Sequence, residues 1–443
     1  MNLIWIVLGI ALLLIAILRW NLPAFPALLM TSILVGLLTG LAPEELLQSV
    51  RNGMGGTLGF VAIVVGLGAM LGKLLEEIGG INALAATLLR TFGEQRATWA
   101  LGLLGFLVAI PVFFDVGFII LVPLIAGLSR KSGRPILLYA IPLLAGLVIT
   151  HSFIPPTPGP IAVVDLLKAD ISWVIIFGTL AGLPAMAIAG PLFGRYIAGK
   201  IPHGAPEEHH ITGEEPAELP GFWTIAGLII LPLALIILNT SSKYIFDGGA
   251  FFRIFFEFVG HPFIALLITT LILFVIAGRR PGFSREGVSR AATAALEPAG
   301  IIILVTGAGG VFKQVLVDSG MGTLIAQKMA GVPVSPIVLA FLITGIVRVV
   351  QGSATVAMIS GAGMSAPILE GMSLSAPYMA LVVVAISAGA TIASHVNDSG
   401  FWLVSRYLGL DEKETLMSWT TMTTLVGAVA LGIVLLLSLL VHQ

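Results

Sequence analysis

The sequence contains no cysteine, so disulfide bonds and thiol chemistry play no part in this protein. Charged residues are also scarce. They make up 10% of the 443 residues, against about 25% in an ordinary soluble domain. The formal net charge is −1, which gives no basic surface for binding nucleic acid. With 57% hydrophobic residues, the composition indicates a membrane protein over almost its whole length.

Several motifs that would power or catalyse a reaction are missing as well. The sequence has no G-x-x-x-x-G-K-[ST] motif, so it gives no support for transport driven by ATP hydrolysis. The two histidines in apolar segments, His151 and His395, lack the H-E-x-x-H spacing of a zinc enzyme. We therefore expect no enzymatic activity, no cofactor and no metal, and we expect an ion gradient to supply the energy.

One stretch, ITHSFIPPTPGP at residues 149–160, breaks an otherwise apolar run over residues 136–167. Its four prolines remove backbone donors and clash with the preceding helical turn. Inside a bilayer, a broken backbone is tolerated only where it is buried in protein or borders a wet cavity. The bland alternative is a proline-rich loop between two short helices. The site interpretation predicts that this break binds a ligand through His151, Ser152, Pro156 and Thr157.

Three further apolar segments are interrupted by polar residues: 98–128 at IPVFFDVGF, 336–366 at RVVQGSATVA and 377–408 at IASHVNDSGF. If all four breaks meet at mid-depth, their helix starts favour an anion, and their hydroxyl and amide groups suit a polyhydroxylated body. The alternative for each polar residue is that it only stabilises a broken backbone. The binding residues expected from these three breaks are Asp115, Gly117, Gln351, Gly352, Ser353, Thr355, His395, Asn397, Asp398 and Ser399.

Ionisable groups at this depth are costly unless they are protonated or paired, so they are candidates for carrying a proton. The candidates are Asp115, His151, His395 and Asp398. Arg348 has two open interpretations, because it could attract an anion or snorkel to the membrane interface.

Two halves of the chain resemble each other weakly. Residues 66–85 align without a gap to residues 307–326, and each half continues with an interrupted segment and a broken span. The expected domains are N-terminal scaffold spans at 1–56, including a polar connection at 43–56, and a first repeat at 57–199. A hydrophilic cytoplasmic linker at 200–220, connecting spans at 221–297 and a second repeat at 298–443 follow.

The basic residues give an orientation. Placing the arginine-rich loop at 279–290 in the cytoplasm and treating both interrupted segments as re-entrant hairpins puts most of the remaining lysines and arginines on that side. The two hairpins then start from opposite sides. The sequence therefore predicts an all-α polytopic membrane protein with two inverted-topology repeats, each with a re-entrant hairpin and a broken transmembrane helix.

The segments VFFDVGFIILVPL, HSFIPPTPGP, QGSATVA and SHVNDSGFWLV resemble the signatures of the gluconate permease (GntP) family of bacterial proton symporters. The resemblance extends over nearly the whole chain. It implies a multi-pass protein of the bacterial inner membrane that imports gluconate or a related sugar acid with protons. It also implies a homodimer with elevator-type alternating access. The chain departs from the family at Thr157, where many members have histidine, which predicts a change in specificity if this position touches substrate.

Three alternatives stay open at this point. The first is transport of D-serine, which some family members accept, or of another small organic anion. The second is coupling to sodium, which amide and hydroxyl oxygens could bind as well as they bind a sugar hydroxyl. The third is a passive channel, which would show no concentrative uptake.

Overall fold

The structure, a computed structural model, describes residues 8–9, 11–13, 15–16, 19–20, 22–204, 219–247, 249–280, 283–320, 335–370, 372–396 and 398–441. Within these ranges the regular secondary structure is entirely helical. More than half of the first eighteen residues and most of the linker at 200–220 lie outside the described residues.

The helices of the first half follow one another with short connections. They are α2 (Ala24–Leu38), α3 (Pro43–Glu77), α4 (Gly80–Phe92), the 3₁₀ turn η1 (Glu94–Arg96), α5 (Ala97–Val108), α6 (Phe114–Ser132), α7 (Leu137–Phe153), α8 (Pro158–Leu167), α9 (Ile171–Ala187), the π-helical turn η2 (Ile188–Leu192) and α10 (Phe193–Lys200).

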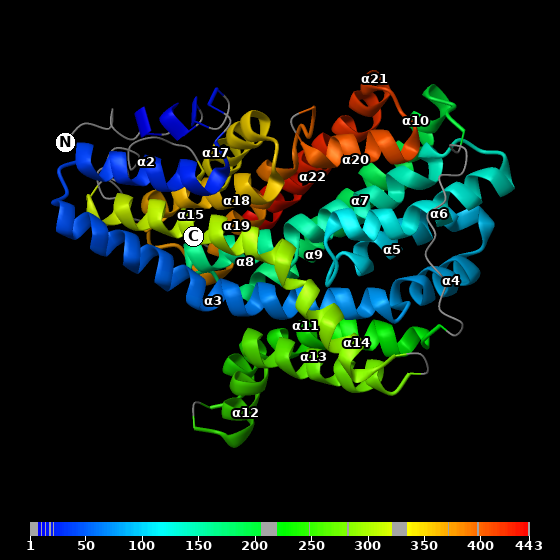
Figure 1. The fold of residues 1–443 in the computed structure, drawn as a ribbon, viewed down its shortest axis with the longest axis horizontal. Coiled ribbons are helices and arrows are strands. Elements are labelled where there is room, and N and C mark those ends of the chain that lie inside the picture. The colour runs from blue at the N-terminus through cyan, green and yellow to red at the C-terminus, as the bar shows by residue number, and fades with distance from the viewer. Residues whose placement is uncertain are drawn as a thin grey trace.

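The second half begins with a group of helices that lies to one side of the main body (Figure 1). This group is α11 (Phe222–Ile245), α12 (Phe251–Val259), α13 (Pro262–Gly278) and α14 (Arg285–Ala294). The chain then returns to the main body with α15 (Leu296–Asp318), α17 (Pro336–Gln351), α18 (Ala354–Leu369), α19 (Ala376–Thr391), α20 (Ser399–Leu408), α21 (Glu412–Thr415), the π-helical turn η3 (Leu416–Thr420) and α22 (Thr421–Ser438).

Six helical stretches of the described chain are long and apolar enough to cross a membrane, or seven if the pair α12 and α13, bent by 68°, counts as one span. The most deeply enclosed of them is residues 137–167, which combines α7 and α8 across the proline-rich break and is 89% buried over its most apolar window. The broken span is therefore the most buried of the six stretches.

Glycines allow the helices of each half to pack closely around their broken spans. A β-carbon at Gly105 of α5 would lie 2.3 Å from the carbonyl oxygen of Leu143 in α7. In the other half, a β-carbon at Gly389 of α19 would lie 2.4 Å from the carbonyl oxygen of Phe341 in α17. In both halves, therefore, the first hairpin helix packs closely on the first helix of the broken span.

Contacts also join the two halves. α3 packs along α15, where a β-carbon at Gly53 would meet the carbonyl oxygen of Gly310 at 2.6 Å. α8 packs on α18, and α6 contacts α20, where the Phe118 and Tyr407 rings are 6.2 Å apart. Each hairpin therefore contacts the second helix of the opposite half's broken span. This exchange agrees with two related repeats, whose inverted topology stays a prediction.

One expected boundary falls inside a helix. Residues 43–56, expected as a polar connection, form the first part of α3, which runs without interruption from Pro43 to Glu77. The expected boundary between residues 56 and 57 lies inside this helix. Polar residues of its first turns, Glu44 and Glu45, stand where acidic side chains favour a helix N-terminus.

Candidate functional site

All four interruptions are present between helices. α5 ends at Val108 and α6 begins at Phe114; α7 ends at Phe153 and α8 begins at Pro158. In the second half, only Gly352 and Ser353 separate α17 from α18, and residues 392–398 separate α19 from α20. Each break leaves backbone groups outside helical hydrogen bonding at the ends of the flanking helices.

A cavity of about 550 Å³ lies where these segments meet, which is within the range of about 300–1,000 Å³ typical of small-molecule sites. All four interrupted segments contribute to its wall, and α15 and α22 complete it. The polar residues that line it are Asp115, His151, Ser152, Arg348, Ser353, Thr355, Thr391, Asp398, Ser399 and Thr423.

The strongest charged contact in the cavity joins two segments that are fifty positions apart. Nη2 of Arg348, on α17, lies 2.5 Å from Oδ2 of Asp398, which caps α20. The Arg348 side chain is 3% exposed and that of Asp398 is 12% exposed. The Nε and Nη1 atoms of Arg348 are buried and have no hydrogen-bond partner in the described part of the chain. A buried donor without an acceptor costs about 1–3 kcal/mol, so a further acceptor at this guanidinium would be favourable.

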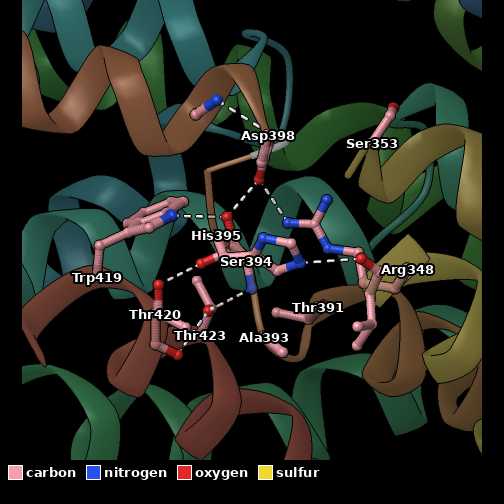
Figure 2. A network of polar contacts seen from close by, with 12 residues as sticks. Arg348, Ser353, Thr391, Ala393, Ser394, His395, Asp398, Trp419, Thr420 and Thr423 are labelled. Carbon is pink, nitrogen blue, oxygen red and sulfur yellow. Dashed lines mark hydrogen bonds and ion pairs between the residues drawn. The ribbon is translucent and has the colours of Figure 1, made fainter. Parts of the chain in front are cut away.

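A network of hydrogen bonds holds Asp398 in place (Figure 2). The Ser394 hydroxyl donates to Oδ2 of Asp398, and the Gly400 backbone N–H donates to Oδ1 at 3.1 Å. Nε1 of Trp419 donates to the Ser394 hydroxyl at 2.6 Å. The break is thus fixed by the π-helical turn η3 of the neighbouring span, a type of distortion that often occurs at functional sites.

Backbone groups of the same break are paired with threonines of α22 and η3. The Ala393 N–H donates to the Thr424 hydroxyl at 3.1 Å, and the Thr420 hydroxyl donates to the Ser394 carbonyl. The Ser394 N–H lies 3.4 Å from the Thr423 hydroxyl. Side-chain hydroxyls therefore replace the helical hydrogen bonds that the break removes.

Two other ionisable residues face the cavity with fewer partners. Asp115 lies in the first turn of α6, its side chain is exposed to the cavity, and no described residue pairs with it. His151, near the end of α7, is half-buried, and its Nδ1 atom is buried without a partner among the described residues. The cavity therefore contains one cation, two carboxyl groups and one imidazole.

Three helices start at the cavity wall. Its lining includes Phe114 and Asp115 of α6, Ala354 and Thr355 of α18, and Ser399 and Gly400 of α20. The first N–H groups of a helix point outward unpaired, and the positive end of the helix dipole lies there. Together with Arg348, these helix starts make the cavity favourable for an anion.

Comparison with known proteins decides the family. The profile described as "GntP family permease" matches residues 1–440. The chain is 40% identical to a gluconate permease of Pseudomonas aeruginosa, over 96% of this chain and 95% of that protein. It is 38% identical to the Gnt-II system L-idonate transporter of Escherichia coli, over the full length of both chains.

The chain belongs to the GntP family of permeases. The resemblance noted in its sequence is thereby confirmed: the protein is a multi-pass membrane transporter and not an enzyme. A location in the bacterial inner membrane fits its relatives.

Two solved structures share the fold. The YdaH transporter of Alcanivorax borkumensis aligns with a TM-score of 0.62 at 19% identity, over 90% of this chain and 89% of that one. MtrF of Neisseria gonorrhoeae, described as one of a class of antimetabolite efflux pumps, aligns with a TM-score of 0.64 at 16% identity, over 88% and 84%. At these identities the likeness concerns the fold alone.

Seven of the expected binding residues of this GntP permease border the cavity. They are Asp115, His151, Ser152, Ser353, Thr355, Asp398 and Ser399. Asn397 lies outside the described residues. These positions come from all four interrupted segments, so one cavity gathers side chains from each of them.

Three expected residues of the first half do not border the cavity. Gly117 packs against α7, where a β-carbon would lie 3.1 Å from Leu147. Pro156 and Thr157 instead line a void of about 10 Å³ beside α3. The Thr157 hydroxyl donates to the Ile154 carbonyl at 2.6 Å, so it supplies a hydrogen bond to a backbone carbonyl of the break itself. The departure from the family at Thr157 therefore gives no direct contact through which specificity would change.

Three expected residues of the second half also lie outside the wall. Gly352 has a φ of +87°, a conformation that favours glycine, and it makes the turn between α17 and α18. Oε1 of Gln351 is buried without a partner among the described residues. Nε2 of His395 lies 2.9 Å from the Val349 carbonyl oxygen, so this ring supports the backbone.

Several lining residues were not among the binding residues expected from the sequence, which left open whether Arg348 attracts an anion or snorkels. Arg348 does not snorkel, because its guanidinium is buried against Asp398. The remaining missed residues include Thr391, Trp419, Thr423 and an apolar stripe of α15 made of Pro298, Ile301, Ile302 and Val305. The only sequence signal for the α22 side was the polar run SWTTMTT in an apolar span.

Proposed function

We propose that this permease imports gluconate or a related sugar acid by proton symport, and that the anion binds in the cavity between the four breaks. The observation that carries the proposal is the buried Arg348 guanidinium, which borders the cavity and has two nitrogens without an acceptor. A carboxylate is the acceptor that best fits a guanidinium, because its two oxygens match two parallel N–H bonds.

The rest of the wall suits the body of a sugar acid. Hydroxyls of Ser353, Thr355 and Ser399 border the same cavity and can both donate to and accept from a polyol chain. The quoted relatives support this substrate class, since they are named as a gluconate permease and an L-idonate transporter. Because these relatives share 38–40% identity, the choice between the two sugar acids rests on experiment.

Proton coupling and alternating access extend the proposal. Asp115, His151, His395 and Asp398 remain the candidates for the proton, and two of them, Asp115 and Asp398, are carboxyl groups on the cavity wall. Elevator movement, inverted repeats and a homodimer follow from the family resemblance. The exchange of contacts between hairpins and broken spans of opposite halves supports the repeat arrangement.

Uptake into proteoliposomes tests this function. Labelled gluconate should accumulate when the outside is more acidic than the inside, and accumulation should stop when a protonophore collapses the gradient. The assay is run with and without sodium. Gluconate influx that ignores the pH gradient but follows sodium would contradict proton symport while leaving the sugar-acid substrate in place.

The alternative substrate is D-serine or another small organic anion, driven by protons or sodium. D-serine carries an ammonium group beside its carboxylate, and the two carboxyl groups of the cavity, Asp115 and Asp398, could receive it. Competition of labelled gluconate uptake with unlabelled gluconate, L-idonate and D-serine separates these substrates. Stronger competition by D-serine than by either sugar acid would favour the alternative.

A further inference from the structure

Arg348 is the only cation that lines the cavity in the described part of the chain, and it is already paired with Asp398. We infer that an incoming substrate carboxylate displaces Asp398 from Arg348. Asp398 is then the group that takes up the coupled proton. This inference rests on the proposed transport of a sugar acid. It selects one residue among the candidates and explains why an anion and a proton move together.

The geometry of the guanidinium sets up the competition. A guanidinium binds a carboxylate through two parallel N–H bonds in one of two ways, using Nη2 with Nη1 or Nη2 with Nε. Both ways include Nη2, the atom that Asp398 contacts at 2.5 Å, whereas Nη1 and Nε have no partner among the described residues. A substrate carboxylate bound in either way therefore shares Nη2 with Asp398 or replaces it.

Charge decides the outcome of that competition. The pair of Arg348 and Asp398 is neutral, and both side chains are largely withdrawn from water. Adding a substrate carboxylate would leave two negative groups on one positive group, and like charges that share such a site cannot both remain ionised at low cost. One proton on Asp398 restores neutrality among Arg348, Asp398 and the substrate carboxylate. One anion and one proton therefore occupy the site together.

The surroundings of Asp398 can support it in both forms. The Ser394 hydroxyl donates to the ionised carboxylate and accepts from Trp419 Nε1. A hydroxyl has one donor and two acceptor positions, so Ser394 has a second acceptor position for the O–H of a protonated Asp398. The Gly400 N–H, 3.1 Å from Oδ1, can donate to either form. Protonation therefore need not break the network that fixes the start of α20.

The other titratable groups near the site lack this link to the substrate. Asp115 of α6 and His151 of α7 face the cavity, but neither is paired with Arg348. His395 of the same break contacts the Val349 carbonyl and does not border the cavity. Binding of a carboxylate at Arg348 changes the partner of Asp398 alone among these groups.

The step is balanced as follows. Outside, a proton from water bonds to a carboxylate oxygen of Asp398, and the substrate carboxylate accepts the N–H groups of Arg348. Inside, the substrate leaves, the proton on Asp398 returns to water, and the carboxylate pairs with Arg348 again. Outside, a hydronium ion supplies the proton and leaves as water, and inside, water accepts it again, so only O–H bonds of Asp398 and of the solvent form and break.

Proton uptake on substrate binding tests this inference without transport. Purified protein in weakly buffered detergent solution is mixed with gluconate, and a pH indicator records the protons taken up. Near neutral pH the wild type should take up about one proton per gluconate, and its affinity should weaken up to about tenfold per pH unit as the pH rises. The Asp398→Asn variant should bind gluconate with no proton uptake and with an affinity that does not depend on pH.

The matched comparison is Asp115→Asn, the other carboxyl group of the cavity. It should still take up a proton when gluconate binds, whatever its affinity. Proton uptake that persists in Asp398→Asn, or that is lost only in Asp115→Asn, overturns the inference. Binding to the wild type without proton uptake also overturns it. If neither gluconate nor L-idonate binds the wild type, the proposed function itself is wrong.

A second measurement covers the case in which Asp398→Asn does not fold. Infrared difference spectra of the wild type should show a carboxylic acid C=O band that appears when gluconate binds. Because Ser394 hydrogen-bonds Asp398, Ser394→Ala should shift this band. A band that Ser394→Ala leaves unchanged and Asp115→Asn removes would assign the proton to Asp115 instead.

Discussion

Gly72 of α3 lies directly against the carbonyl of Pro111 at the tip of the first hairpin. A β-carbon at Gly72 would lie 1.9 Å from that carbonyl oxygen, a distance that no side chain can adopt. The tip residues Ile110 and Val112 are buried, whereas Ser353 at the tip of the second hairpin is exposed. The structure thus closes the first hairpin against α3 and leaves the second tip accessible.

Gly72→Ala should therefore push the first hairpin tip away from α3. We expect a loss of about 1–3 kcal/mol in stability, as for other overpacked sites, together with a reduced rate of gluconate uptake. Thermal unfolding in detergent and initial uptake rates measure the two effects. The matched control is Gly59→Ala on the same helix, where nothing lies within 4 Å of the added β-carbon. Equal effects of the two substitutions would contradict the proposed packing role of Gly72.

Arg348→Lys should weaken gluconate binding although it keeps the positive charge. Lysine cannot provide two parallel N–H bonds, and a charge-assisted hydrogen bond contributes about 1.5–3 kcal/mol, which corresponds to roughly ten- to hundredfold in affinity. Equilibrium binding of labelled gluconate measures the change. Arg406→Lys, on the exposed side of α20, is the control and should bind normally. Wild-type affinity in Arg348→Lys would show that the substrate carboxylate does not bind this guanidinium.

Thr157 and Thr355 should differ as substrate contacts although the sequence alone predicted both. The Thr157 hydroxyl donates to the Ile154 carbonyl outside the cavity, so Thr157→Val should cost about 1 kcal/mol of stability and leave the gluconate-to-idonate preference unchanged. Thr355 borders the cavity, so Thr355→Val should weaken gluconate binding by about fivefold. Competition between gluconate and L-idonate measures the preference of both variants. A changed preference in Thr157→Val would contradict the position of Thr157 outside the binding cavity.

The absence of native cysteine makes accessibility measurements direct, because an introduced thiol is the only one. Ala354→Cys places it on the cavity wall at the start of α18, and gluconate should slow its reaction with N-ethylmaleimide. Ser289→Cys, exposed on α14 away from the cavity, should react at the same rate with and without gluconate. Protection at Ser289 but not at Ala354 would place the ligand elsewhere.

The sequence predicted the breaks well because their causes are local. Proline at 155, 156, 158 and 160 cannot continue a helix, and the glycine at 352 adopts a positive φ that ends one. These local signals account for two of the four interruptions. The other two were located from polar residues inside apolar runs, and the four segments together supplied seven of the lining residues. At residues 43–56 polarity predicted a connection between spans, and the structure continues one helix through this segment from Pro43.

Contacts between distant segments could not be predicted from the sequence. The direction in which Arg348 points depends on the position of Asp398, which lies on another segment. The sequence of α17 alone was therefore consistent both with snorkelling and with an ion pair. Trp419 gave no signal because its partner, Ser394, is 25 positions away. The hydrogen bond of the Thr157 hydroxyl to the Ile154 carbonyl was likewise not predicted, because composition does not reveal such local competition for a hydroxyl.

The central claim is that the four breaks form one anion site centred on Arg348. An experimental structure of the protein in lipid nanodiscs with gluconate bound tests it most directly. We predict density for gluconate in the cavity bordered by Asp115, Arg348 and Ser353, with its carboxylate within hydrogen-bonding distance of the Arg348 guanidinium. Gluconate density outside this cavity, or with the carboxylate turned away from Arg348, would contradict the account.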